Sequence, residues 1–193
     1  MIRYGLCVAL GLICGSALAD YSAHPKAGDL LETLRSDYAF DSEALKATRA
    51  ALIEAQRVDK LIQRERTAPE RTWTWYDYRP IHVNPKNIEN GQAFVEQHQA
   101  TFAAAEKRWG VPGPVVAAII GAETKYGSYT GPHRILDSLA TQGFDHPTRT
   151  RFFFNELVEY FVLCRELGFD PLEPKGSYAG AMGLSQLLPS LYR

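Results

Sequence analysis

Glu123 is the residue of this chain best suited to acid–base chemistry. It stands near the end of the stretch VPGPVVAAIIGAETKYG, residues 111–127, which is otherwise mostly apolar. The apolar residues that share its predicted helix face are Val116, Ile119 and Ile120. A carboxylate on a face turned to the core loses hydration when ionised, which favours the protonated form that a general acid needs. The alternative is an ion pair of Glu123 with Lys or Arg at the rim of the core.

The local sequence also predicts the helix that positions Glu123. Pro112 and Pro114 suit a first turn, where a missing backbone N–H costs nothing and φ is already helical. Gly127 suits the left-handed residue that ends a helix. We therefore expect one short helix with Glu123 near its carboxyl end.

A second stretch, GSYAGAMGLSQLLPS at residues 176–190, is rich in glycine. Its three glycines allow the backbone to come close to a ligand or to another helix, although glycine-rich turns are also common linkers. Together with IIGAETKYG at 119–127 and RILDSLAT at 134–141, this stretch occurs in the order and spacing of the lytic murein transglycosylases of the B type. From about Phe40 to its last residue the chain resembles these family 3 enzymes, which cleave peptidoglycan.

The resemblance implies roles for individual residues. It makes Glu123 the catalytic acid, places Ser177 near that carboxylate, and puts Gln186 and Arg149 along the glycan cleft. Met182, in the same glycine-rich stretch, would add an apolar surface under a sugar ring.

The motifs offer one carboxylate, whereas most glycosidases use two. Asp137 lies inside a predicted helix and Asp145 is predicted to be a helix N-cap, so neither is a persuasive partner. The resemblance implies a scheme with a single acid and base. Glu123 would protonate the glycosidic oxygen of a β-1,4 bond between N-acetylmuramic acid (MurNAc) and N-acetylglucosamine (GlcNAc). It would then take the proton of the muramoyl O6 hydroxyl, which closes a 1,6-anhydro ring. A hydrolytic muramidase, or a truncated glycan-binding or scaffolding protein without turnover, are the alternatives.

The composition is that of an ordinary globular protein. The 193 residues are 46% apolar and 22% charged, with a formal net charge of -1, which allows a sizeable core and shows no basic excess of the kind that nucleic-acid binders carry. We therefore expect peptidoglycan glycan strands as the partner and no nucleic acid, and protein partners stay open. No D-x-D-x-D-G run is present, so we expect no metal and no cofactor.

Residues 1–19 are predicted to be a secretory signal peptide. A basic start is followed by a short apolar run and by the small residues of an A-x-A-like cleavage site before Asp20. The run is too short to span a membrane, and a buried N-terminal helix is the alternative. Because neither Cys7 nor Cys14 follows a small residue, we expect a periplasmic protein without a lipid anchor and without an integral membrane segment in the mature chain.

Helical periodicity predicts several further helices. They cover residues 30–39, 43–66, 87–109, 134–141 and 148–167. The segment TWTWYDYRP at 72–80 is predicted to be extended, with its aromatic side chains forming either a clamp between helices or a platform for sugars. His98 is predicted to lie at the edge of the core, and Cys164 to be a small buried apolar residue.

The fold class expected from these elements is mainly α. A helical N-terminal region, residues 20–86, would pack beside a lysozyme-like transglycosylase core over residues 87–193. The resemblance implies that family members run well beyond Arg193. The core is therefore expected to be incomplete at its carboxyl end, and the chain to be a truncated member.

Overall fold

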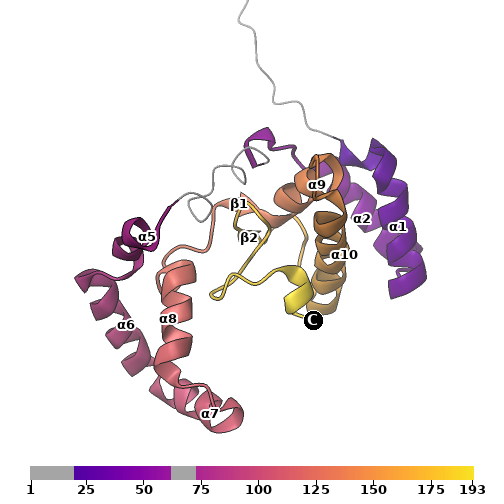
Figure 1. Ribbon diagram of the computed structural model, residues 1–193. Coiled ribbons are helices and arrows are strands. Elements are labelled where there is room, and N and C mark those ends of the chain that lie inside the picture. Colours follow the sequence, from indigo (N-terminus) through magenta and orange to yellow (C-terminus); the bar gives the residue numbers. More distant parts are fainter. Residues whose placement is uncertain (1–19, 62–72) are drawn as a thin grey trace, which may run out of the picture.

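The computed structural model describes residues 20–61 and 73–193, and these residues are mainly helical (Figure 1). One group of helices, which we call the body, consists of α1 (Pro25–Tyr38), α2 (Ser42–Glu54), α9 (Ile135–Asp145) and α10 (Thr150–Leu167). A second group, which we call the arm, consists of α5 (Trp75–His82), α6 (Pro85–Gln97), α7 (Gln99–Trp109) and α8 (Gly113–Thr124). The prediction of a mainly α fold is confirmed. The predicted signal peptide lies outside the described residues.

The first two helices of the body begin at side-chain caps. His24 precedes α1 and its Nδ1 accepts a hydrogen bond from the N–H of Lys26, while Asp41 precedes α2 and its carboxylate accepts one from the N–H of Ala44. Such caps satisfy backbone donors that have no partner within the helix. The helix predicted over residues 30–39 is present as α1, but it begins earlier because His24 and Pro25 form its start.

The long helix predicted over residues 43–66 is wrong in its length. The helix α2 ends at Glu54, and the backbone is extended at Ala55. Beyond this point the N–H of Gln56 donates to the carboxylate of Asp137 at 2.8 Å, and the N–H of Val58 donates to the hydroxyl of Thr141 at 3.0 Å. Backbone donors that would continue the helix are thus taken by side chains of α9.

The core of the body lies around α9 and α10, which pack on each other. Helix α9 is buried on all sides from Ile135 to Phe144, so the inward placement predicted for Leu136 and Leu139 is confirmed. Helix α10 ends at Gly168, whose φ is +69°, as predicted. Its Cys164 is buried, and burial raises the pKa of this thiol to about 11. The prediction of a small buried residue at this position is confirmed.

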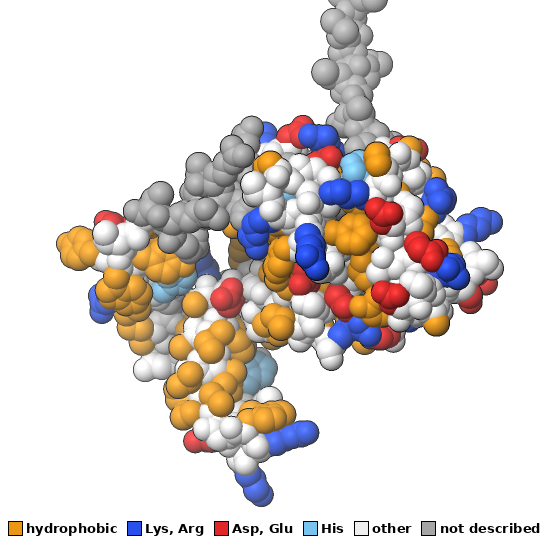
Figure 2. All heavy atoms as spheres, turned by 45° about the vertical axis from the view of Figure 1, so that its right-hand side comes forward, with side chains coloured by type: hydrophobic (Ala, Val, Ile, Leu, Met, Phe, Trp, Pro, Cys, Tyr) orange, Lys and Arg blue, Asp and Glu red, His pale blue; other side chains and the backbone are white. Residues whose placement is uncertain are grey.

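Within the arm, α8 packs against α6 and α7, and α6 and α7 pack on each other. Figure 2 shows apolar side chains gathered over the arm, whereas charged side chains are spread over the body. Among the described residues, the large apolar side chains exposed on the arm helices and the short links between them are Trp75, Tyr76, Ile81, Val83, Ile88, Trp109, Val111, Val115 and Ile119. No helix in the described part of the chain combines the length and the apolar character that crossing a bilayer requires.

Two predictions about the arm are wrong. The segment predicted to be extended forms α5, which starts at a capping box of Thr74 and Asp77 and contains Pro80. Its Trp75 and Tyr76 are 66% and 87% exposed, so these rings do not clamp two helices together. The single helix predicted over residues 87–109 is two helices, because the backbone leaves helical geometry at His98, whose ring instead lies against that of Phe94.

A short sheet lies between the arm and the body. Strand β1 (His133–Arg134) runs antiparallel to β2 (Lys175–Gly176), with His133 paired to Gly176. After β2 the chain makes close turns up to residue 187 and ends in the 3-10 helix η2 (Pro189–Leu191).

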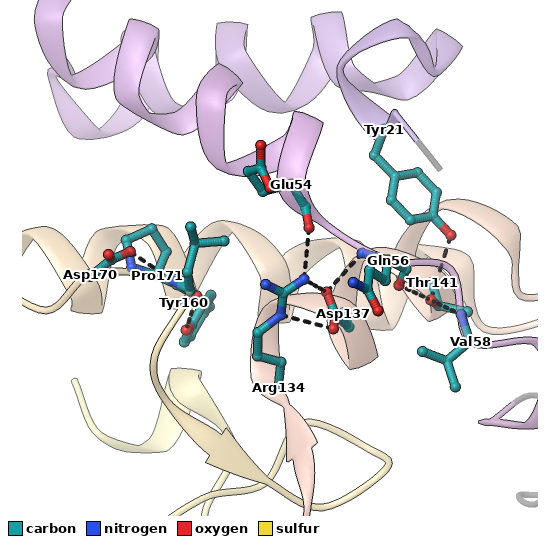
Figure 3. A network of polar contacts seen from close by, with 11 residues as sticks. Tyr21, Glu54, Gln56, Val58, Arg134, Asp137, Thr141, Tyr160, Asp170 and Pro171 are labelled. Carbon is teal, nitrogen blue, oxygen red and sulfur yellow. Dashed lines mark hydrogen bonds and ion pairs between the residues drawn. The ribbon is translucent and has the colours of Figure 1, made fainter. Parts of the chain in front are cut away.

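Arg134 at the end of β1 belongs to a polar network with the N-terminal segments (Figure 3). Its Nε and Nη2 donate to the two carboxylate oxygens of Asp137 at 2.9 and 2.7 Å, and Nη2 also donates to the carbonyl of Glu54 at 2.7 Å. This carboxylate raises the pKa of Arg134 above its ordinary value. The network fixes β1, α9 and the end of α2 to one another.

The division of the chain into residues 20–86 and 87–193 stays a prediction. Helix α1 packs on α10 and on α2, and buried residues of α1, α2, α9 and α10 form one core. Packing therefore runs across the predicted boundary.

Candidate active site

Glu123 lies in the last turn of α8, as predicted from the prolines at the start of that helix. The face of α8 that is buried differs from the prediction. It consists of small residues, namely Gly113, Ala117, Gly121 and Thr124. Small side chains allow α8 to lie close to α6 and α7, so Ile119 and Glu123 are exposed instead. The expectation that Glu123 shares a core-facing side of its helix is therefore wrong in this structure.

The chain turns sharply after Glu123. Helix α8 ends at Thr124, and Lys125, Tyr126 and Gly127 follow with φ values of 50°, 60° and 84°. Gly127 is left-handed as predicted, but the helix stops three residues before it. Thr124 is buried, and its hydroxyl accepts from the N–H of Gly127 at 3.0 Å and lies 2.9 Å from the carbonyl of Leu184. This hydroxyl joins the end of α8 to the glycine-rich segment.

Ser177 stands directly after β2, at the start of a tight turn. Its hydroxyl oxygen accepts hydrogen bonds from the N–H groups of Ala179 and Ala181 at 3.3 and 3.1 Å. The turn is so tight that a Cβ added to Gly176 would collide with the carbonyl of Ala181. A serine hydroxyl has two lone pairs and one hydrogen. With both lone pairs used by the turn, Ser177 can act toward a ligand as a donor.

Gln186 joins the glycine-rich segment to the loop that follows Glu123. Its side-chain NH2 donates to the carbonyls of Thr130 and Gly183, both at 3.0 Å. The backbone of Gln186 is left-handed, with φ of 48°, which is a strained conformation for a residue with a side chain. With both amide hydrogens engaged, the side-chain oxygen is the part of Gln186 that can accept from a ligand.

These three residues line one small cleft of about 100 Å³ between the arm and the body. The cleft is lined by Glu123, Tyr129, Gly131, Pro132, His133, Ser177, Tyr178 and Gln186. Among the described residues Glu123 is the one carboxylate that lines it. The structure thus brings together three of the predicted site residues from parts of the chain that are more than 50 positions apart.

The other two predicted site residues do not line this cleft. The guanidinium of Arg149, just before α10, lies over the rings of Phe152 and Phe153 at 4.7 and 4.9 Å. The N–H of Met182 donates to the carbonyl of Leu187, and its side chain packs on the core of the body. Their assignment to a glycan cleft stays a prediction.

Neither aspartate considered as a second carboxylate lines the cleft. Asp137 is held by Arg134 and Gln56. Asp145 is the last residue of α9 and accepts from the hydroxyl of Tyr21 at 2.7 Å, so the prediction that it caps the next helix is wrong. The Nδ1 atom of His146 accepts from the N–H groups of Thr148 and Arg149, in the turn that precedes α10. Within residues 20–61 and 73–193, no three His, Cys, Asp or Glu side chains are grouped as a metal ion would need.

Three residues with polar side chains in the cleft were missed from the sequence: Tyr129, His133 and Tyr178. Tyr129 and His133 belong to the loop SYTGPHR, and Tyr178 follows Ser177. Aromatic rings with polar atoms are common in sugar-binding sites because they combine stacking area with hydrogen bonds. These residues lie next to the motifs at 119–127 and 176–190, and this position in the sequence could have identified them.

Comparison with known proteins shows sequence similarity to transglycosylases over most of the chain. Residues 28–193 match the transglycosylase SLT domain. The membrane-bound lytic murein transglycosylase B of Escherichia coli K12 is 33% identical over 183 residues, which are 90% of this chain and 50% of that protein.

Solved structures agree in fold. The catenated lytic transglycosylase SltB1 from Pseudomonas aeruginosa superposes with a TM-score of 0.83 and 38% identity over 90% of this chain and 56% of the other. SltB3 from the same organism, in complex with NAG-anhNAM-pentapeptide, superposes with a TM-score of 0.73 and 25% identity over 86% of this chain and 44% of the other. The chain thus spans about half the length of the relatives that it matches. The expected lysozyme-like transglycosylase fold is confirmed.

Proposed function

The chain belongs to the transglycosylase SLT domain family, and on this premise we propose that it is a lytic transglycosylase, which cleaves the β-1,4 bond between MurNAc and GlcNAc in peptidoglycan. The observation that carries the proposal is the convergence of Glu123, Ser177 and Gln186 on one cleft. The anhydro-sugar ligand bound by the relative SltB3 supports the substrate class and the kind of product.

Glu123 performs both proton transfers in this reaction. As an acid it gives its proton to the glycosidic oxygen, the bond from that oxygen to C1 of MurNAc breaks, and the GlcNAc end leaves as an alcohol. As a carboxylate it then takes the proton of the O6 hydroxyl of MurNAc, whose oxygen bonds to C1 and closes the 1,6-anhydro ring. No water is consumed, and Glu123 ends protonated, ready for another cycle.

The neighbours of Glu123 assist by hydrogen bonding. The hydroxyl of Ser177, whose lone pairs are engaged by its own turn, donates toward the carboxylate or the substrate. The side-chain oxygen of Gln186, whose NH2 is engaged by Thr130 and Gly183, accepts from a sugar hydroxyl. A glycan lying over Glu123, which is exposed in the free protein, excludes water from it and strengthens its hydrogen bond to the glycosidic oxygen.

The test is digestion of purified sacculi by the wild type and by Glu123→Gln. We expect the variant to lose turnover and keep its fold, because the amide has the shape of the acid but cannot transfer its proton. Glu96→Gln, at an exposed residue of α6 that does not line the cleft of Glu123, is the matched control and should digest at the wild-type rate. Full turnover by Glu123→Gln would remove this residue from the acid role.

Mass analysis of the released muropeptides separates the transglycosylase from its two alternatives. Anhydro ends are lighter by one water than the reducing ends that a hydrolytic muramidase leaves. Binding of sacculi without release of muropeptides by the wild type would identify a glycan-binding protein.

We also propose that the protein works in the periplasm, where peptidoglycan lies. The signal peptide predicted at residues 1–19 supports export. Fractionation of cells by osmotic shock and sequencing of the mature N-terminus test this, with release into the periplasmic fraction and a start at Asp20 as the expected result. A cysteine acylated at its N-terminus would identify a lipoprotein instead.

A further inference from the structure

The turn that follows Glu123 is an unusual piece of backbone. Lys125 and Tyr126 both have left-handed φ, at 50° and 60°, although they are not glycine. Side chains disfavour this region, and such residues persist when their surroundings hold them there. The turn begins two residues after Glu123, so whatever holds the turn also holds the end of α8.

The ring of Tyr126 lies in a slot between two glycines of different helices. A Cβ added to Gly121 on α8 would lie 2.5 Å from Cζ of Tyr126, and one added to Gly91 on α6 would lie closer still to the phenol oxygen. Real Cβ atoms essentially never come nearer than 3.0 Å to another atom. The ring therefore fits here because both positions lack a side chain.

A second aromatic residue closes the slot. The ring of Phe94 on α6 lies 5.4 Å from that of Tyr126, and Phe94 in turn lies 6.0 Å from Phe102 on α7. Tyr126 thus joins the end of α8 to α6 through ring contacts. It lines the groove between α6, α7 and α8 and is not among the residues that line the cleft of Glu123.

We propose that Tyr126 is a positioning residue for Glu123. Its ring, seated between Gly91 and Gly121, fixes the left-handed turn and so sets where the carboxylate stands relative to Ser177 and Gln186, which come from the glycine-rich segment beside the body. This rests on the proposed function, in which Glu123 is the acid. An acid displaced by about 1 Å loses on the order of a hundredfold in rate.

The experiment compares variants of the full chain in sacculus digestion, with kcat and KM determined separately, and in thermal melting. Tyr126→Phe keeps the ring and should keep a kcat within about twofold of the wild type. Tyr126→Ala empties the slot and should lower kcat on the order of a hundredfold, with KM changed much less, because Ser177 and Gln186 keep the hydrogen bonds that hold them on their own side of the cleft. Gly28→Ala, where an added Cβ meets nothing within 4 Å, is the matched glycine control and should behave as the wild type.

A double-mutant cycle tests the slot itself. Gly121→Ala should lower both kcat and the melting temperature in the presence of the Tyr126 ring, and should have a much smaller effect in the Tyr126→Ala background. Should Tyr126→Ala not fold, Tyr126→Leu gives the same comparison, because leucine keeps apolar volume but cannot reach both glycines.

The outcomes are distinct. An active wild type whose kcat is unchanged in Tyr126→Ala or Tyr126→Leu overturns the positioning role alone. Additive effects of the Gly121 and Tyr126 changes overturn the slot. A wild type that digests no sacculi overturns the proposed function and the positioning role with it, whereas the coupling in melting temperature still decides whether the slot exists.

Discussion

Replacing Asp137 by alanine should destabilise the body of the protein substantially. The side chain of Asp137 is 11% exposed, and its carboxylate accepts three hydrogen bonds, two from Arg134 and one from the backbone N–H of Gln56. Asp137→Ala would leave the Arg134 guanidinium, whose side chain is 23% exposed, without its carboxylate, and the Gln56 N–H without its acceptor.

The expected loss of folding free energy lies between the values known for buried and for exposed ion pairs. Removing one partner of a fully buried ion pair costs about 3–5 kcal/mol, and removing one of an exposed pair costs about 0–1 kcal/mol. Arg134 keeps some contact with water and with the carbonyl of Glu54, so we expect about 2–3 kcal/mol for Asp137→Ala. For a chain of this length, each kcal/mol lowers the melting temperature by about 2–4 °C, which gives a decrease of about 4–12 °C.

The assay is thermal unfolding at neutral pH, followed by circular dichroism. Glu32→Ala is the matched control, because Glu32 and Arg35 form an ion pair at the same sequence spacing with side chains 60% and 59% exposed. This change should lower the melting temperature by no more than about 4 °C. Asp137→Asn, which keeps one acceptor oxygen, should fall between the two. If Asp137→Ala has the same melting temperature as Glu32→Ala, the network in Figure 3 does not stabilise the fold and our estimate is wrong.

Two further predictions concern buried or partly buried titrating groups. Loss of hydration lowers the pKa of His24 below 6.5, although the charge of Asp145 opposes this shift. The folded protein therefore holds His24 neutral more strongly than the unfolded chain does. The stability that this contributes is fully present above pH 6.5 and is lost as the pH falls through the lowered pKa of His24. His24→Asn keeps a cap for α1 without titrating. On acidification the melting temperature of the wild type should therefore fall more steeply than that of the variant, and parallel curves would contradict this. The thiol of Cys164, with its pKa raised to about 11 by burial, should react with a disulfide reagent at neutral pH far more slowly in the folded protein than in denaturant. A variant whose other two cysteines are serine isolates this thiol, and equal rates in both conditions would show that Cys164 is accessible.

The helix of Glu123 could be predicted from sequence, but its orientation could not. Pro112 and Pro114 indicate its start, and the structure has the helix there. The predicted orientation is wrong because hydropathy gives weight to Val and Ile, whereas the buried face of α8 consists of small residues. A Cβ at Gly113, for example, would lie 2.9 Å from Cβ of Phe102, so close packing of helices rather than apolar area decides this face.

The errors in helix length have a long-range cause. Helix α2 ends where Asp137 and Thr141, more than 80 residues away, accept from its continuing backbone, and no local residue signals this. Proline, by contrast, is an ambiguous local signal. Pro80 is predicted to close an extended segment but lies within α5.

The candidate site could be predicted as far as its motifs reached. Glu123, Ser177 and Gln186 line one cleft, and their roles toward a glycan stay a prediction. Tyr129 and His133 line it as well, because β1 pairs with β2 and folds their loop over Ser177. That pairing involves two residues in each strand, which is too short to leave a periodic pattern in the sequence.

The contacts between the arm and the body, which we call the joint, give the cleft a thermal stability that differs from that of the core. Glu123 comes from the arm and Ser177 from beside the body, and the hydrogen bonds from Thr124 to Leu184 and from Gln186 to Thr130 lie at this joint. Protein segments open independently when few buried contacts hold them. Heating should therefore separate the two halves of the site while α9 and α10 remain folded. The temperature at which the proposed activity is lost would then be set by the contacts between the arm and the body, and a more stable core alone would leave that temperature unchanged.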